Sequence, residues 1–376
     1  MAVNIRYTPH GDEFYRTARE RVNRYFSEKG ISRHADASMY RKTCSLLAIY
    51  VALYAMILSN HFTGWGLFFL QIAFHCDTFL IAVGIAHDGS HNAYSSKRSI
   101  NRAITYVFDL IGINSHFWTY NHLHSHHVAP NVPLIDSAIE SFAGIRLHPR
   151  TKKTRMSRYQ HLYMFFVYSL VPLFQLWLLE FISFRQNVTG YQKGDQHTRH
   201  QMVLLYVSKV VVAAYSLIIP LIVVHVPAWQ IIAGFLAGHM ITGITLGIVF
   251  QTTHLCDHSV FPEPDENGLL PNTFSRHIME TTSEFAVNSP VITWICGGLN
   301  LHVTHHLFPN ICQTHLHTIS KIVRQTAREY NMPYKSYTLT QAIASHLRCL
   351  RTLGNAPSYE TASPQPQPNY QPASMS

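Results

Sequence analysis

Apolar residues are gathered into five blocks separated by polar segments. The blocks cover about residues 43–60, 64–86, 162–184, 203–225 and 229–251. The first two come close to the ~20 apolar residues that a helix needs to cross a bilayer. At a rise of about 1.5 Å per residue, the second block reaches roughly 34 Å. The pattern therefore predicts an all-α integral membrane protein rather than a soluble enzyme.

Short connections join these blocks in pairs. Asn60-His61-Phe62-Thr63 forms the junction of the first two blocks, and only Val226-Pro227-Ala228 separates the last two. We therefore expect two tight hairpins of spanning helices, four helices in all. Three segments follow: an N-terminal cytosolic segment (1–42), a membrane domain with a cytosolic cap (43–352) and a tail (353–376). The tail is rich in Pro and Gln without periodicity, which predicts disorder.

The distribution of charge predicts the orientation. Lys and Arg are concentrated in residues 1–42 and 87–161, whereas neither hairpin loop carries one. By the positive-inside rule both basic segments lie in the cytoplasm. Residues 252–352 share that side only if one of the three later blocks does not cross.

The block at 162–184 is the one that we expect to lie in the membrane interface. Glu180 interrupts it and a basic run precedes it. An interfacial helix with a polar edge costs less than an isolated carboxylate inside hydrocarbon. Lys209 offers weaker grounds against the block at 203–225, because it lies near an end and can snorkel to the surface.

Composition narrows the function further. Only 13% of the 376 residues are charged, compared with about a quarter in ordinary soluble domains. The formal charge of +9 matches the cytoplasmic faces of a membrane protein and requires no nucleic acid. The six cysteines form no C-x-x-C pair, so neither a disulfide framework nor a zinc finger is expected. Histidine is the unusual residue, with 26 copies that occur in clusters.

Three histidine boxes stand where apolar blocks end or in the polar segments. They are His87-Asp88-Gly89-Ser90-His91, His122-Leu123-His124-Ser125-His126-His127 and His302-Val303-Thr304-His305-His306, and His254 adds a fourth signal. Residues at i and i+4 share one face of a helix, so each box can direct several imidazoles to one place. His124 is left out, because at i+2 from His122 it faces away.

The number of imidazoles points to two metal ions. Nine exceed what one tetrahedral zinc site with an open position uses. Neutral imidazole binds iron, copper, zinc or nickel alike, so ligand type does not select the metal. A lipid-like substrate has unactivated carbon–hydrogen bonds, and breaking them requires dioxygen and a redox-active metal. The pattern therefore favours iron.

Three polar residues inside the apolar blocks have other interpretations. His75 and His239 are expected to pack or hydrogen-bond within the helix bundle. Asp77 either lines a substrate path or is a paired structural carboxylate.

Around the boxes the chain resembles the membrane fatty acid desaturases, in particular the bacterial linoleoyl-CoA and front-end branch. The matching stretches are residues 87–95 (HDGSHNAYS), 118–127 (WTYNHLHSHH) with Asn131, 249–254 (VFQTTH), 261–264 (FPEP) and 297–309 (GGLNLHVTHHLFP). The likeness covers roughly residues 10–350. Histidine at 302 stands where this branch usually carries glutamine.

The resemblance implies a diiron enzyme that uses O2 to introduce a double bond into an acyl chain carried by CoA, a carrier protein or a lipid. The implied iron ligands are His87, His91, His122, His126, His127, His254, His302, His305 and His306. Asp88, Asn131 and Asp136 are candidates to orient these imidazoles, although capping or turn roles are equally open for the last two. The resemblance also supports four spanning helices with a cytosolic cap and an embedded segment at 162–184.

Partners and location follow from the same resemblance. No His-Pro-Gly-Gly haem motif is present, so we expect electrons from a separate protein such as a ferredoxin or a flavin reductase. The expected location is a bacterial inner membrane, with membrane lipid around the helices and the active site facing the cytoplasm.

Other functions remain open at this point. A membrane diiron hydroxylase, ketolase or acetylenase would use identical ligands. A metal transporter would place ionisable ligands near the bilayer midplane, whereas these clusters lie at helix exits. A purely structural membrane protein would not need the histidines at all.

Overall fold

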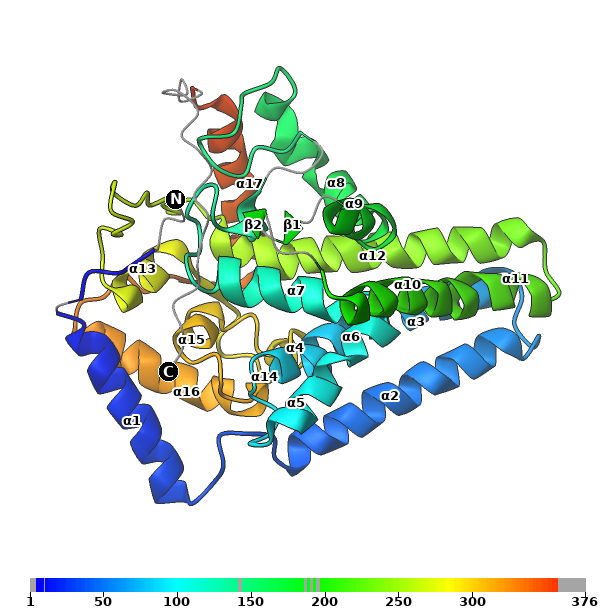
Figure 1. The fold of residues 1–376 in the computed structure, drawn as a ribbon, viewed down its shortest axis with the longest axis horizontal. Coiled ribbons are helices and arrows are strands. Elements are labelled where there is room, and N and C mark those ends of the chain that lie inside the picture. The colour runs from blue at the N-terminus through cyan, green and yellow to red at the C-terminus, as the bar shows by residue number, and fades with distance from the viewer. Residues whose placement is uncertain are drawn as a thin grey trace.

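The computed structural model describes residues 5–9, 11–140, 144–185, 188–189, 192–193 and 197–357. Helices dominate these residues, which confirms the predicted helical class (Figure 1). The strands within the described ranges have two residues each. β1 (Val188–Thr189) pairs antiparallel with β2 (Gln192–Lys193), and β3 (Glu284–Phe285) pairs parallel with β4 (Ser336–Tyr337).

Within the described ranges, five helical rods are long and apolar enough to cross a membrane, judged by length and composition. They are α2 (Ala37–Leu58); α3 (Gly64–Ile81) with the π-helical turn η1 (Ala82–Ala86) and α4 (His87–Ser90); η4 (Ser157–Tyr159), α8 (Gln160–Phe174), η5 (Gln175–Leu179) and α9 (Glu180–Arg185); α10 (Arg199–Ala213), η6 (Ala214–Ile218) and α11 (Ile219–Val223); and α12 (Ala228–His254). Each rod corresponds to one of the apolar blocks, although the first and fourth blocks extend two residues beyond theirs. α2 begins before the predicted block, inside the segment assigned to the N-terminus.

Both predicted hairpins are present, and their turns touch each other. The Asn60 side chain donates to the Val223 carbonyl at 3.0 Å and accepts from the His225 backbone N–H at 2.6 Å. Figure 1 shows these turns at one end of the molecule, and the elements that carry the histidine boxes lie towards the other end. The two hairpins are therefore joined at the end without Lys or Arg.

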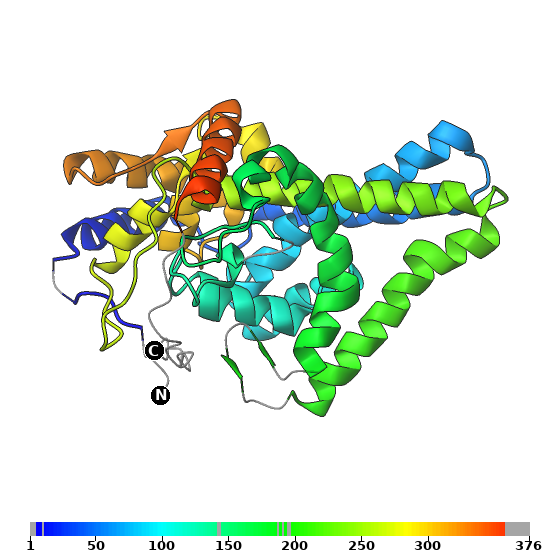
Figure 2. The same ribbon diagram turned by 90° about the horizontal axis from the view of Figure 1, so that it is seen from above.

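The rod formed by α8 and α9 has a different course from α12. Figure 2 shows that it crosses α12 instead of running beside it. Glycines allow this close crossing, because a Cβ atom at Gly243 would lie 2.3 Å from the Tyr168 carbonyl oxygen, and one at Gly247 would lie 2.3 Å from the Tyr168 ring.

A buried ion pair connects α9 with α10. Glu180 and Lys209 are both buried, and their charged atoms are 2.7 Å apart. Glu180 also accepts from the Asn114 backbone N–H at 3.2 Å, and Lys209 donates to the Gly112 carbonyl. The expectation that Lys209 snorkels to the surface is therefore wrong, because a carboxylate lies within its reach inside the protein.

Removing one partner of this pair should be strongly destabilising. Lys209→Met leaves the Glu180 carboxylate buried without its cation, which costs about 3–5 kcal/mol in known buried pairs. The double variant Glu180→Gln/Lys209→Met removes both charges and should recover most of that loss. Thermal unfolding in detergent measures both effects. Equal melting temperatures for the single and the double variant would contradict this account.

The remaining helices form the cap and its links to the rods. They are α1 (Glu13–Lys29), α5 (Arg98–Thr105), α6 (Val107–Leu110), α7 (Ser115–Asn121), η2 (His122–His126), η3 (Ser137–Ile139), α13 (Phe274–Thr281), α14 (Pro290–Ile295), α15 (His302–Leu307), α16 (Gln313–Glu329) and α17 (Leu339–Asn355). The buried face of α1 packs with α16 in one apolar cluster. α17 includes residues 353–355, which the prediction had assigned to the tail. Residues 358–376 lie outside the described part of the chain.

Candidate metal centre

The three boxes and His254 converge in the cap. Eight buried histidines form two groups, and within each group one ring nitrogen per residue lies within 4.8 Å of the others. The first group is His87, His91, His122 and His305; the second is His126, His254, His302 and His306. Each group combines residues from distant parts of the chain, so the fold assembles both.

A π-helical turn shapes the second box. The turn η2 covers His122–His126, and the His127 backbone N–H donates to the His122 carbonyl at 2.9 Å. This wider turn brings residues at i, i+4 and i+5 towards one side, and such turns are frequent at functional sites. The sequence analysis expected an ordinary helix here, because no residue type marks a π turn.

The ninth histidine, His127, lies between the first group and the second. Its Nε2 is 3.1 Å from the Nε2 atoms of both His122 and His305, and its ring stacks on His306 with centroids 4.1 Å apart. His124 belongs to neither group and instead packs against Tyr120. Its exclusion from the candidate ligands agrees with this position.

The donor atoms fit metal ions better than hydrogen bonds. His122 Nε2 lies 3.2 Å from His87 Nε2, 3.0 Å from His91 Nε2 and 3.1 Å from His127 Nε2. A neutral imidazole nitrogen offers one hydrogen or one lone pair, so it cannot serve three such partners. Both nitrogens of His306 and Nε2 of His126 are buried without a hydrogen-bond partner. Because unpaired buried polar atoms are costly, these residues fit a pair of bound metal ions.

Burial keeps these ligands in the form that metals bind. Removal from water, reinforced by neighbouring imidazoles, lowers the pKa of His302, His305 and His306 well below its ordinary value. The rings are therefore neutral, and a neutral ring has a free lone pair for a metal.

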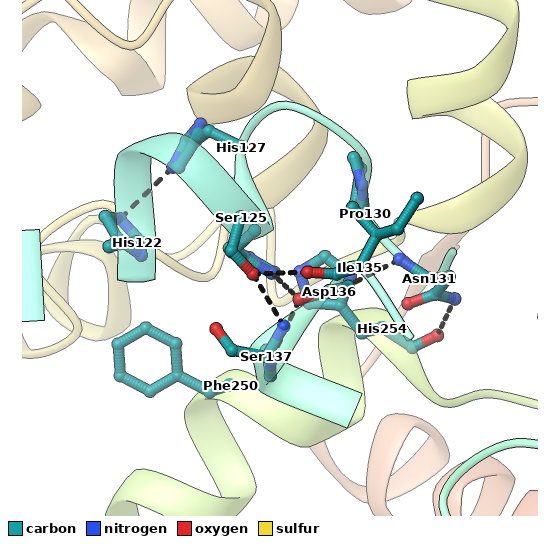
Figure 3. A network of polar contacts seen from close by, with 12 residues as sticks. His122, Ser125, His127, Pro130, Asn131, Ile135, Asp136, Ser137, Phe250 and His254 are labelled. Carbon is teal, nitrogen blue, oxygen red and sulfur yellow. Dashed lines mark hydrogen bonds and ion pairs between the residues drawn. The ribbon is translucent and has the colours of Figure 1, made fainter. Parts of the chain in front are cut away.

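Asp136 orients one candidate ligand and also contacts the loop at Asn131 (Figure 3). Its Oδ1 accepts from His126 Nδ1 at 2.9 Å, which leaves Nε2 of that ring free for a metal. Its Oδ2 accepts from the Asn131 backbone N–H at 2.8 Å, and the Asn131 side chain donates to the His254 carbonyl at 3.0 Å. Asp136 and Asn131, two of the three candidates to orient the imidazoles, thus form a chain of hydrogen bonds from the His126 ring to the His254 backbone.

The third candidate, Asp88, has a different environment. Its Oδ1 is 3.9 Å from His87 Nδ1, too far for a hydrogen bond, and its Oδ2 accepts from the Gln313 backbone N–H at 3.0 Å. Asp88 therefore connects the first box to the start of α16.

A largely apolar cavity of about 420 Å³ reaches the histidine groups. His122 and His126 are part of its wall, and the π turns η1, η5 and η6 supply Ala82, Gln175 and Tyr215. π turns therefore shape both the second box and this cavity.

The polar residues inside the apolar blocks are now placed. His75 and His239 line the cavity with ring centroids 4.3 Å apart, and His239 Nδ1 donates to the Phe235 carbonyl. They pack within the bundle, as expected. Asp77 fits neither of its two interpretations. It is buried, it is absent from the described cavity wall, and neither carboxylate oxygen has a hydrogen-bond partner.

Comparison with known proteins identifies the family. The family model "Fatty acid desaturase" matches residues 60–338, well over half of the chain. The chain belongs to the fatty acid desaturase family. This desaturase is 30% identical over 357 residues to an sn-1 linoleoyl-lipid 6-desaturase of Synechocystis sp., covering 91% of this chain and 96% of that protein.

Two further relatives agree. An acyl-lipid (8-3)-desaturase of Physcomitrium patens is 28% identical, and the match covers 91% of this chain and 72% of that protein. A second sn-1 linoleoyl-lipid 6-desaturase, from Arthrospira platensis, is 28% identical, and the match covers 92% of this chain and 93% of that protein. The family predicted from the histidine boxes is confirmed, and with it an oxidoreductase that desaturates acyl chains.

The desaturase also contains a buried carboxylate, Glu284, that the sequence analysis missed. Glu284 Oε1 accepts from the Thr304 backbone N–H at 3.0 Å and the Thr304 hydroxyl at 2.7 Å, beside His305. Its other oxygen accepts from Ser320 and Tyr334. Burial raises the pKa of Glu284, while these hydrogen bonds act in the opposite direction. No spacing connects residue 284 with 304, so only the fold shows that Glu284 holds α15.

Loss of the Asp136 carboxylate should weaken metal binding. Asp136→Ala frees the His126 ring to rotate, and loss of such orienting partners typically costs about 10–100-fold in metal affinity or activity. Asp136→Asn should retain more affinity, because its amide oxygen can still accept from Nδ1. Titration of the metal-free protein with ferrous iron measures both variants. An alanine variant with wild-type affinity would show that Asp136 has only a local capping role.

Proposed function

We propose that this desaturase binds two iron ions, one in each histidine group, and uses O2 to introduce a double bond into an acyl chain. The proposal rests on the observation that both histidine groups contribute a residue to the wall of the cavity. His122 belongs to one group and His126 to the other, and both line the same largely apolar cavity. An acyl chain in that cavity would lie against both groups.

The proposed topology has four spanning helices, namely α2, α3 with α4, α10 with α11, and α12. The rod α8–α9 lies in the interface, and its crossing of α12 supports this position (Figure 2). The hairpin turns carry no Lys or Arg, whereas the cap is basic. We therefore place the cap and the metal centre on the cytoplasmic side, in a bacterial inner membrane.

The proposed substrate is an acyl chain in a membrane lipid. The described wall of the cavity contains no Lys or Arg, and Glu140 and Glu180 are its only acidic members. Such a wall suits the acyl chain itself, so the class of carrier is proposed from the relatives' names. The relatives' names, which specify lipid substrates, favour the same class.

The residues have distinct tasks in the mechanism. Bound iron would supply the reduction of O2 and the removal of one hydrogen from each of two adjacent methylenes. In total, one O2, the two hydrogens taken from the acyl chain, two electrons from the donor and two protons become two waters. Apolar walls that include Phe117, Leu246 and Phe250 hold the chain beside the histidines and exclude other water. Asp136 keeps the Nδ1 proton on His126, so that the lone pair of Nε2 would be available to a metal. A separate ferredoxin or flavin reductase would supply the electrons.

Expression in a host that lacks this activity, followed by mass spectrometry of total fatty acids, tests the proposal. We expect a product lighter by two hydrogens in the lipid fraction, together with about two iron ions per purified chain, as the two histidine groups require. A product with an added oxygen atom would show a hydroxylase instead. A second assay supplies membranes with either labelled acyl-CoA or labelled lipid. If only the acyl-CoA were desaturated, the proposal of a lipid substrate would be wrong.

A further inference from the structure

The helix α14 (Pro290–Ile295) has its polar and apolar sides reversed. Val291, Trp294 and Ile295 are 65%, 45% and 41% exposed, whereas Thr293 is buried. The Thr293 hydroxyl accepts from the Asn300 side chain at 3.2 Å. A helix in water should show the opposite arrangement, because exposed apolar side chains are unfavourable there.

The position of α14 explains this reversal. Trp294 lies beside Lys42 of α2: its carbonyl accepts from Lys42 Nζ at 2.6 Å, and this nitrogen is 4.7 Å from its ring centroid. On the inner side, Ile292 packs in a cluster with Val83 and Leu246, which belong to the rods containing α3 and α12. The helix therefore sits where three spanning rods enter the cap.

The neighbouring helix α2, which contacts Trp294 through Lys42, also exposes apolar side chains. Leu47, Ile49 and Val51 of α2 are exposed, as expected for a helix that faces lipid. Tryptophan is enriched at the boundary between membrane and water, where the ring sits at headgroup level. Neither Lys, Arg, Asp nor Glu occurs between Pro290 and Ile295. These features favour lipid over water as the neighbour of this face.

We propose that α14 is an interfacial anchor, whose Val291, Trp294 and Ile295 insert into the lipid leaflet on the metal side. The inference rests on the membrane placement of α2 and α3 and does not depend on the metal or the substrate. It adds a lipid contact outside the five long rods.

This anchor is linked directly to the third histidine box. Gly297 follows α14 and packs on η1, where a Cβ atom would lie 2.2 Å from the Val83 carbonyl oxygen. His302 begins α15 a few residues later. The depth of α14 in the leaflet therefore fixes the height of α15 above the membrane.

Tryptophan fluorescence of the full-length protein in nanodiscs tests the proposal. The lipids carry bromine atoms, which quench tryptophan fluorescence, either near the headgroup or near the methyl end of the acyl chain. The fluorescence of Trp294 is obtained as the difference between wild type and Trp294→Phe. We expect a blue-shifted signal that bromine near the headgroup quenches about twofold more strongly, because interfacial helices enter only ~5–10 Å. Trp229, exposed at the start of α12, is the reference, measured through Trp229→Phe.

The other outcomes overturn the proposal. Quenching of Trp294 by aqueous iodide but not by brominated lipid would place α14 in water. Protection from both quenchers would indicate a protein neighbour, such as a second copy. Lack of lipid quenching at Trp229 as well would refute the membrane placement itself. If Trp294→Phe does not fold, a benzophenone side chain at position 291 gives the same decision: cross-links to lipid support the anchor, and cross-links to protein refute it.

Discussion

His306→Ala is expected to lose iron from the second histidine group and to lower desaturation to about one hundredth of wild type or less. Both nitrogens of this buried ring lack a hydrogen-bond partner, which fits a metal ligand better than a hydrogen-bonded histidine. Orienting residues already cost about 10–100-fold, and a direct ligand should cost at least as much. Iron per chain and the fatty acid profile measure the two effects.

The matched control is His124→Ala. This histidine belongs to the same kind of box, yet it lies outside both groups. It should keep wild-type iron and activity. Iron loss in both variants to the same extent would indicate a general folding defect, and retention of iron in His306→Ala would remove this residue from the ligand set.

Leu246→Trp is expected to abolish activity while iron remains bound. Leu246 lines the cavity, and the larger side chain would occupy the space of the acyl chain. A displacement of about 1 Å at the reacting position can cost around 10²-fold. Overpacking should also lower stability, by about 1–3 kcal/mol. The measurements are iron content, melting temperature and product yield.

Ile241→Trp provides the control on the same helix. Ile241 of α12 is exposed and is not part of the described cavity wall, so tryptophan there should leave activity near wild type. If Leu246→Trp retained full activity with unchanged products, the cavity would not be the acyl site.

The sequence predicted the helical class, both hairpins and the nine histidines that meet in the cap, because these depend on local signals. Apolar blocks set helix lengths, and a spacing of i, i+4 sets which imidazoles share a face. The boundaries were less accurate: α2 begins before the block, and α17 extends into the expected tail.

Contacts between distant segments could not be predicted in this way. The pair Glu180–Lys209 joins α9 with α10, and Glu284 holds α15 through Thr304. Each depends on how helices pack after they form. The π turn at His122–His126 was also missed, because it widens the backbone hydrogen-bond pattern of a helix and no residue type marks it.

The division of ligands between the two histidine groups has a consequence for biogenesis. The first group needs His305 beside residues from the first third of the chain, and the second needs His302 and His306. A nascent chain that has inserted only its first hairpin thus holds neither set. Under the proposed assignment of iron to these groups, the first site would be complete only after residue 305 is made, and the second only after residue 306.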